Sequence, residues 1–140
     1  MALWGAPVAN PDDPIRCVSC ALEQREVLAR FNRARAAENY PALQIGIGIH
    51  TGPVVAGYIG SSKALSYTVI GDTANTSARL CAVAAAGQIL VSEATLERLH
   101  NRFEYEELPP ARLKGKEKPF RVFDIKRLRP GVQVPASVQS

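Results

Sequence analysis

The stretch that decides the fold is YTVIGDTANTSARL, over residues 67–80. It begins as a strand, passes through Gly71 and continues as a helix whose first turns carry polar residues. The free N–H groups and the positive dipole end of such a helix suit an anion. Asn75 and Arg79 are four residues apart and share one helical face, where a guanidinium beside an amide suits a phosphoester and a sugar. An exposed pair of this kind is, however, commonly only solvated.

Upstream of this stretch the pattern alternates between strands and a long helix. We expect a buried strand over 1–7, a helix over 14–37 with Asp13 as its N-cap, and strands over 43–51, 54–60 and 64–70. The last two strands surround a turn and form a hairpin-like unit. Isoleucine alternates with glycine over 45–49, so the isoleucines share one face and the other is left bare for a close neighbour.

Downstream, helices and strands continue to alternate. We expect a helix over 71–86 that packs through Ala74, Ala78, Cys81 and Ala85, a strand over 88–91, a short helix over 92–100 capped by Ser92, and strands over 105–113 and 121–128. This order predicts an α+β fold, a ferredoxin-like or palm-type sandwich in which helices pack on one face of a mainly antiparallel sheet. We divide the chain into one domain over 1–128 and a disordered tail over 129–140.

Composition narrows the class of protein. The 140 residues are 46% hydrophobic, enough for one packed core, and three cysteines are too few and too odd in number for a small secreted disulfide scaffold. No apolar run is long enough to span a bilayer and no leader is evident, so we expect no membrane segment and a cytoplasmic protein. Basic residues gather over 112–129. Few aromatic residues lie among them, so we expect no nucleic-acid partner. The positive charge would equally attract a phosphorylated small molecule.

Three motifs make the sequence familiar. They are IGIHTGPVVAG over 47–57, YTVIGDTAN over 67–75 with Arg79 and Leu80 following, and LKGK over 113–116. In order and spacing they resemble the downstream motifs of the class III nucleotidyl cyclase (adenylate and guanylate cyclase) catalytic domain. The chain is similar to the C-terminal two-thirds of such a domain and most resembles bacterial adenylate cyclases. The N-terminal strand and helix of the family fold have no counterpart in these residues.

The resemblance implies a reaction and roles. In this family the ribose 3′-hydroxyl attacks the α-phosphate and pyrophosphate leaves, at a site shared between two chains. By that likeness Asn75 orients the ribose, Arg79 stabilises charge at the α-phosphate and Lys114 holds the terminal phosphates. Thr68 stands where the family reads the base. Its hydroxyl can donate or accept, so its chemistry does not choose between ATP and GTP, and the bacterial resemblance favours ATP.

The resemblance also implies two Mg²⁺ or Mn²⁺ ions held by two aspartates. The segment that carries both aspartates would precede residue 1. The aspartates present, Asp12, Asp13 and Asp72, lie at predicted helix N-termini, where an aspartate is expected for structural reasons. For this reason we assign no metal ligand. We therefore expect an incomplete domain, inactive alone, that binds ATP and supplies half of a site to a homodimer or to a full-length cyclase chain.

Other interpretations stay open. The chain could be a non-catalytic dimerisation or regulatory module that kept the cyclase fold, or a guanylate cyclase. The CVSC stretch over 17–20 has the spacing of a metal or redox pair, but it lies within a predicted helix with no second pair nearby, which favours helix packing. His50 follows a strand without a nucleophile motif and fits a structural imidazole better than a general base.

Overall fold

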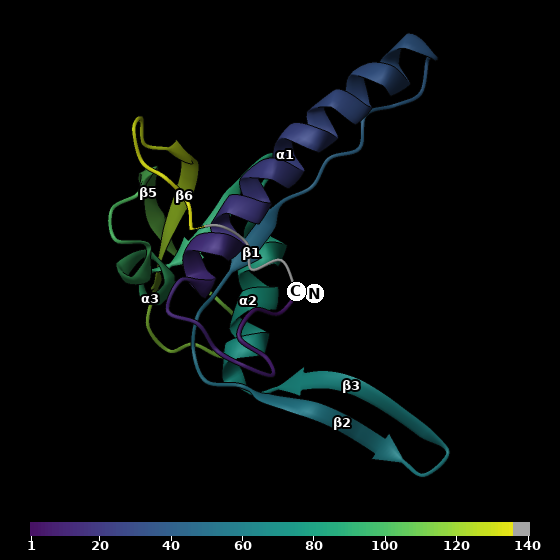
Figure 1. The fold of residues 1–140 in the computed structure, drawn as a ribbon, viewed down its shortest axis with the longest axis vertical. Coiled ribbons are helices and arrows are strands. Elements are labelled where there is room, and N and C mark those ends of the chain that lie inside the picture. Colours follow the sequence, from purple (N-terminus) through teal and green to yellow (C-terminus); the bar gives the residue numbers. More distant parts are fainter. Residues whose placement is uncertain (136–140) are drawn as a thin grey trace.

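The computed structural model describes residues 1–135; residues 136–140, the end of the predicted tail, lie outside the described part. Figure 1 shows a central body from which a long helix and a hairpin project in different directions. The elements in chain order are α1 (Asp13–Ala37), β1 (Ile47–Ile49), β2 (Val55–Ser61), β3 (Ala64–Ile70), α2 (Asp72–Val83), β4 (Ile89–Ser92), α3 (Glu93–Leu96), a 3₁₀ turn (Glu97–Leu99), β5 (Phe103–Ala111) and β6 (Phe120–Leu128).

Four strands form one mixed sheet in the order β1-β4-β6-β5. β1 runs parallel to β4, and the two other pairings are antiparallel. The predicted α+β class and largely antiparallel sheet are confirmed. Within residues 1–135, β2 and β3 pair only with each other, in register from Val55 opposite Ile70 to Ser61 opposite Ala64, which confirms the predicted hairpin.

The two long helices lie on opposite faces of the sheet, so the expectation of helices on one face is wrong. Ile89 and Val91 of β4 belong to the core cluster that contains Ile15 and Val18 of α1. Leu90 points the other way, because side chains alternate along a strand, and clusters with Leu80 of α2. All four residues of β4 are buried because both of its faces are covered.

α2 crosses β1 at its glycines. A Cβ built on Gly48 would lie 2.2 Å from the backbone nitrogen of Cys81, and one built on Gly46 would lie 2.6 Å from the carbonyl oxygen of Ala84. Only glycine allows two backbones to approach this closely. The bare strand face predicted from the isoleucine-glycine alternation is therefore filled by α2.

Two local predictions are wrong. Residues 1–3 have no regular structure and residues 4–8 form bends, so the predicted buried strand is absent: Met1 is 83% exposed, and Gly5 has a φ of +90°, which breaks an extended run. β1 is thus the edge of the described sheet. α2 ends at Val83 and not near 86. It buries Ala74, Thr76 and Leu80, whereas Ala78 and Cys81 are exposed and Ala85 lies beyond the end of the helix.

The helix termini follow local chemistry. α1 begins at Asp13, with Asp12 in the cap position and a proline in the first turn, one residue from the predicted start. Asp13 Oδ2 accepts the backbone N–H of Asn10 at 2.7 Å, so its carboxylate fixes the turn before the helix. Ser92 caps α3 as predicted, since its side chain accepts the N–H of Thr95.

The tail begins with contacts to the body. The N–H of Arg129 donates to the carbonyl of Arg102 at 2.8 Å, and Arg102 Nη1 donates to the carbonyl of Gln133 at 2.6 Å. The disordered tail over 129–140 stays a prediction. Over residues 1–135, none of the helices has the length and hydropathy that crossing a membrane requires.

Candidate functional site

The candidate site starts where β3 ends. Gly71 has a φ of +132°, a conformation that side chains rarely adopt, and it turns the chain from the hairpin directly into α2. Asn75 follows one turn into the helix, with its N–H 3.3 Å from the carbonyl of Gly71 and its side chain exposed. Arg79, one turn further along, is half-buried.

The half-buried position of Arg79 results from contact with the β5–β6 loop (residues 112–119). A Cβ built on Gly115 would lie 3.2 Å from Nη1 and 3.4 Å from Nη2 of Arg79, so the guanidinium rests on the backbone of that glycine. Lys114, which precedes Gly115, is exposed. The fold therefore brings together two predicted site elements, Arg79 and the Lys114 loop, that are 35 positions apart in the sequence.

Thr68 precedes these residues in the chain and lies near the base of the hairpin, opposite Gly57. Its side chain is exposed, four positions before the start of α2. Asn75 shares the helix with Arg79. No contact joins Thr68 to Asn75, Arg79 or Lys114 among those described for residues 1–135, so the four predicted residues form an open surface rather than a closed pocket.

An ion pair that the sequence analysis did not single out holds this surface together. Lys116 Nζ lies 2.5 Å from Asp72 Oδ2, which joins the β5–β6 loop to the first turn of α2. The hydrogen bond from Lys116, followed by the charges of Lys116, Arg79 and His50, lowers the pKa of Asp72 below its usual value. The only hint in the sequence was the second lysine of the LKGK motif.

His50 lies at the end of β1 in a polar cluster under this surface. Its Nδ1 is 2.7 Å from Ser92 Oγ, and its ring meets Phe120 edge-on at 5.9 Å. Burial lowers the pKa of His50; the positive charges of Lys116 and Arg98 add to this, and Asp72 opposes it. These contacts are those of a structural imidazole.

Metal ligands do not assemble among residues 1–135: no three His, Cys, Asp or Glu side chains gather there as a metal would require. Asp72 is committed to Lys116 and Asp13 lies beside Arg16, so the carboxylates near the site do not fit a divalent ion. Burial, then the neighbouring Cys20 and Asp13, raises the pKa of the Cys17 thiol to about 12, which disfavours the thiolate that metal binding or redox chemistry needs.

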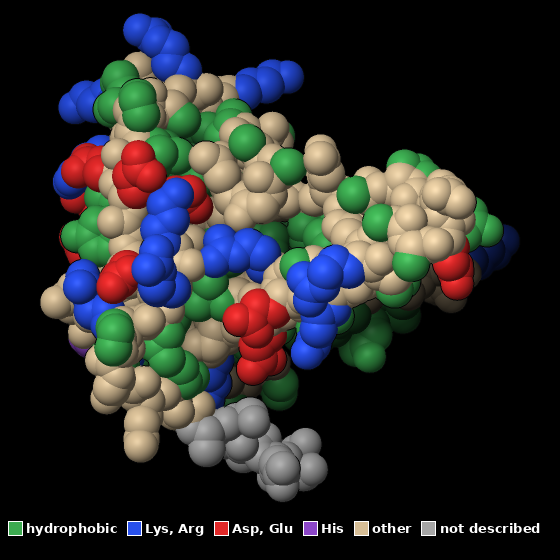
Figure 2. Space-filling view, turned by 90° about the horizontal axis from the view of Figure 1, so that it is seen from above, with side chains coloured by type: hydrophobic (Ala, Val, Ile, Leu, Met, Phe, Trp, Pro, Cys, Tyr) green, Lys and Arg blue, Asp and Glu red, His purple; other side chains and the backbone are tan. Residues whose placement is uncertain are grey.

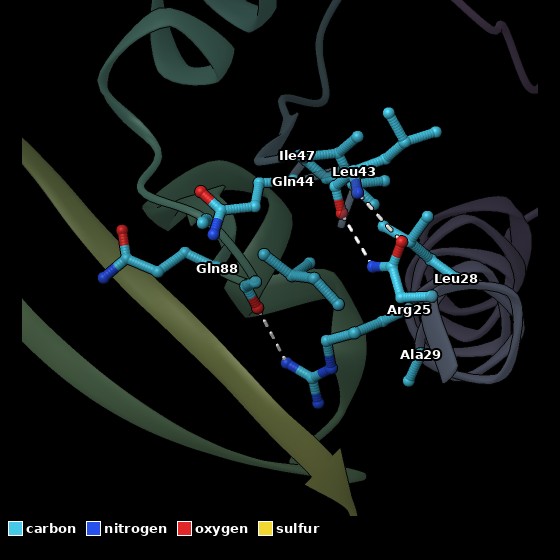
Figure 3. A pocket seen from close by; sticks show the side chains of 12 residues that line it. Arg25, Leu28, Ala29, Leu43, Gln44, Ile47 and Gln88 are labelled. Atoms are coloured by element: carbon cyan, nitrogen blue, oxygen red, sulfur yellow. Dashed lines mark hydrogen bonds between the residues drawn. The ribbon is translucent and has the colours of Figure 1, made fainter. Parts of the chain in front are cut away.

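Two grooves are lined by other residues, although the larger reaches the start of α2 at Thr73 and Ala74. The larger, of about 840 Å³, runs between residues 1–14, α1, the β1 edge and the exposed side of α2. The smaller, of about 270 Å³, lies between α1 and the strand ends (Figure 3). There Arg25 Nη1 donates to the carbonyl of Gly87 at 3.2 Å and Nη2 donates to the carbonyl of Lys126 at 2.5 Å. Arg25 thus binds backbone, and neither groove is lined by Thr68, Asn75, Arg79 or Lys114.

The basic stretch over 112–129 is partly neutralised. Half of its eight basic residues pair with carboxylates on neighbouring strands and helices: Lys116 with Asp72, Arg121 with Glu93 and Glu107, Lys126 with Asp124 and Glu106, and Arg127 with Glu104. Figure 2 shows acidic and basic side chains interspersed on the face it presents. Lys114 and Arg79 are thus distinct from the paired surface charges.

Comparison with known proteins gives consistent matches. A sequence model described as the adenylate and guanylate cyclase catalytic domain matches residues 1–126. The chain is 32% identical to adenylate cyclase 1 of Rhizobium meliloti (strain 1021) over 126 residues, 89% of this chain and 19% of that protein. It is 36% identical to a membrane guanylyl cyclase of Dictyostelium discoideum over 116 residues, 83% of this chain and 7% of that protein.

A solved structure, that of the guanylyl cyclase Cya2, superposes with a TM-score of 0.80 at 32% identity and covers 94% of this chain and 66% of that one. The chain thus spans a fifth or less of these two curated relatives and just under two-thirds of the solved domain. Both adenylate and guanylyl cyclases are among the similar proteins, so the matches leave the base specificity undetermined. The chain belongs to the adenylate and guanylate cyclase catalytic domain family.

Proposed function

We propose that this chain is the nucleotide-binding part of an adenylate cyclase catalytic domain, which in the complete protein converts ATP into 3′,5′-cyclic AMP and pyrophosphate. The observation that carries the proposal is the seating of the Arg79 guanidinium on Gly115, beside Lys114 and one helical turn from Asn75. An amide and a guanidinium on one helix, beside a loop that carries a lysine, are groups that suit the ribose, the α-phosphate and the terminal phosphates of a nucleotide.

Each residue has a role that its chemistry supports. Asn75 holds the ribose through its amide. The 3′-oxygen attacks the α-phosphorus as the proton of the 3′-hydroxyl passes to water, and the bond from that phosphorus to the pyrophosphate oxygen breaks. Arg79 stabilises the negative charge that develops at the α-phosphate, and Lys114 binds the departing phosphates. Since the described residues do not fit a metal, the metal-binding carboxylates are assigned to protein outside these 140 residues and no step is derived through them.

A second chain completes the site in this proposal. The surface of Asn75 and Arg79 is open, and the hairpin next to it projects from the body (Figure 1). Apolar side chains of the hairpin are exposed to solvent. Tyr58 is 74% exposed and Leu65 62%, an arrangement typical of a protein contact surface. A homodimer or a full-length cyclase chain would cover the hairpin and close the nucleotide surface.

The preference for ATP over GTP rests on the bacterial resemblance. The Thr68 hydroxyl can serve either base, so the nucleotide must be tested directly. We would assay this chain and the complete protein with ATP and with GTP, in Mg²⁺ or Mn²⁺, and identify the cyclic product by mass spectrometry.

Cyclic AMP from the complete protein and none from this chain alone is the expected result. Faster formation of cyclic GMP from GTP than of cyclic AMP from ATP would reassign the substrate. Activity of this chain alone would overturn the assignment of the metal ligands to other protein, and no cyclic product from the complete protein with either nucleotide would reject the enzyme function in favour of a non-catalytic module.

A further inference from the structure

The β5–β6 loop is fastened to α2 at two points that lie on either side of Lys114 and Gly115. Before them, Leu113 is only 4% exposed and belongs to the core cluster of Leu80 on α2. After them, Lys116 reaches Asp72 at 2.5 Å. The N–H of Lys116 also donates to the carbonyl of Leu113 at 3.0 Å and closes the turn between the two anchors.

Between these anchors the loop backbone meets Arg79. The hypothetical Cβ of Gly115 lies 3.2 Å from Nη1, 3.4 Å from Nη2 and 3.5 Å from Cζ, so the loop leaves no room for a side chain between this position and the guanidinium. Gly115 has a φ of +81°, which side chains rarely adopt. The glycine and the two anchors together fix how close the loop can come to Arg79.

The ion pair also occupies a carboxylate that could otherwise attract Arg79. Asp72 and Arg79 are seven residues apart, about two turns or 10 Å along the helix, and long helical side chains lean toward the N-terminus. The charge of Arg79 already acts on Asp72, where it lowers the pKa of the carboxyl. With Lys116 removed, Asp72 would draw the guanidinium toward the start of the helix and away from Gly115.

We infer that Lys116 is a positioning residue of the proposed cyclase reaction: paired with Asp72, it holds the Lys114–Gly115 backbone against Arg79 and keeps that guanidinium available to the α-phosphate. This rests on the function proposed above. Lys116 itself does not bind the nucleotide, since its ammonium is engaged by the carboxylate.

The kinetic test uses Lys116→Met, Asp72→Asn, the double variant and Lys116→Arg in the complete protein. The control is Lys118→Met, which removes an exposed lysine of the same loop. We expect kcat to fall about tenfold in both single variants with KM changed less than about twofold, because positioning acts on the transition state. The double variant should lose no more than either single one, and Lys116→Arg should keep most activity. Normal turnover of Asp72→Asn, or a rise in KM confined to Lys116→Met, would overturn the inference, the latter by indicating direct phosphate binding.

A second readout separates this inference from the function itself. In the complete protein labelled with ¹⁵N-arginine, the Nε–Hε signal of Arg79, assigned with Arg79→Lys, should shift in Lys116→Met and in Asp72→Asn but not in Lys118→Met. If the protein makes no cyclic nucleotide, the proposed function fails while this signal still reports the contact. An Arg79 signal that stays unchanged in both variants would reject the positioning role.

Discussion

Replacing Gly48 by alanine tests whether α2 is seated on β1 as closely as the structure has it. The new Cβ would stand 2.2 Å from the backbone nitrogen of Cys81, where ordinary contact begins at 3.4 Å. The obstacle is helix backbone, which cannot rotate away, so α2 must move by about 1 Å at a cost of about 3 kcal/mol, the upper end for overpacking. For a chain of this length that lowers Tm by about 10 °C. Asn75 and Arg79 lie on α2 and would move with it, so cyclase activity should fall as well.

Gly57→Ala is the matched control, because a Cβ at Gly57 meets nothing within 4 Å. Alanine there should leave Tm unchanged or raise it slightly, since glycine loses more backbone entropy on folding. Thermal unfolding of both variants in the complete protein, followed by circular dichroism, gives the comparison. A Gly48→Ala protein as stable as Gly57→Ala would refute the close crossing and with it the placement of α2.

Three further predictions concern the site and its surroundings. Arg79→Ala should lower kcat by about 10²- to 10³-fold with little change in nucleotide affinity, measured by steady-state kinetics and titration calorimetry; near-normal turnover would contradict its role at the α-phosphate. Burial and nearby positive charges lower the pKa of His50 in the folded protein. As the pH falls below about 6.5, this histidine is therefore protonated in the unfolded chain before it is protonated in the folded one. The free energy of unfolding should decrease over this range, until His50 of the folded protein is protonated as well. His50→Asn should make Tm depend less on pH between pH 7 and 5, whereas His100→Asn should not. If Tm falls with pH equally steeply in both variants, the pH dependence does not come from His50. Tyr58→Ser on the hairpin should weaken self-association in sedimentation velocity, whereas Val27→Ser on α1 should leave it intact; a dimer indifferent to Tyr58 would place the contact elsewhere.

Much of the fold was predictable because the sequence carries strong local signals. The isoleucine-glycine alternation over 45–49 gave β1 and its close neighbour, and Gly71 marked the change from strand to helix. Errors arose where tertiary contacts decide. Residues 1–7 were predicted to form a buried strand, yet a buried strand needs a paired neighbour, and the positive φ of Gly5 interrupts the extended run. The sequence of β4 is compatible with burial of one face or of both, so it did not predict that helices cover both faces of the sheet.

The site was predictable in part for the same reason. Asn75 and Arg79 share a helix, so their spacing alone puts them on one face. The contact of Arg79 with Gly115 and the pairing of Asp72 with Lys116 join segments more than 30 residues apart. Nothing in the local pattern specifies such long-range partners, since Asp72 has a sufficient local explanation as an acidic residue in the first turn of a helix.

The isolated β2–β3 hairpin should open locally more often than the rest of the fold. Its two strands bond only to each other, whereas β4 is buried between β1 and β6. Amide hydrogens of the hairpin should therefore exchange with deuterium through local opening, while those of β4 exchange only when the whole domain unfolds. The step between these regimes falls at Gly71, so the turn of α2 that carries Asn75 lies at the border between the fast and the slow part of the chain.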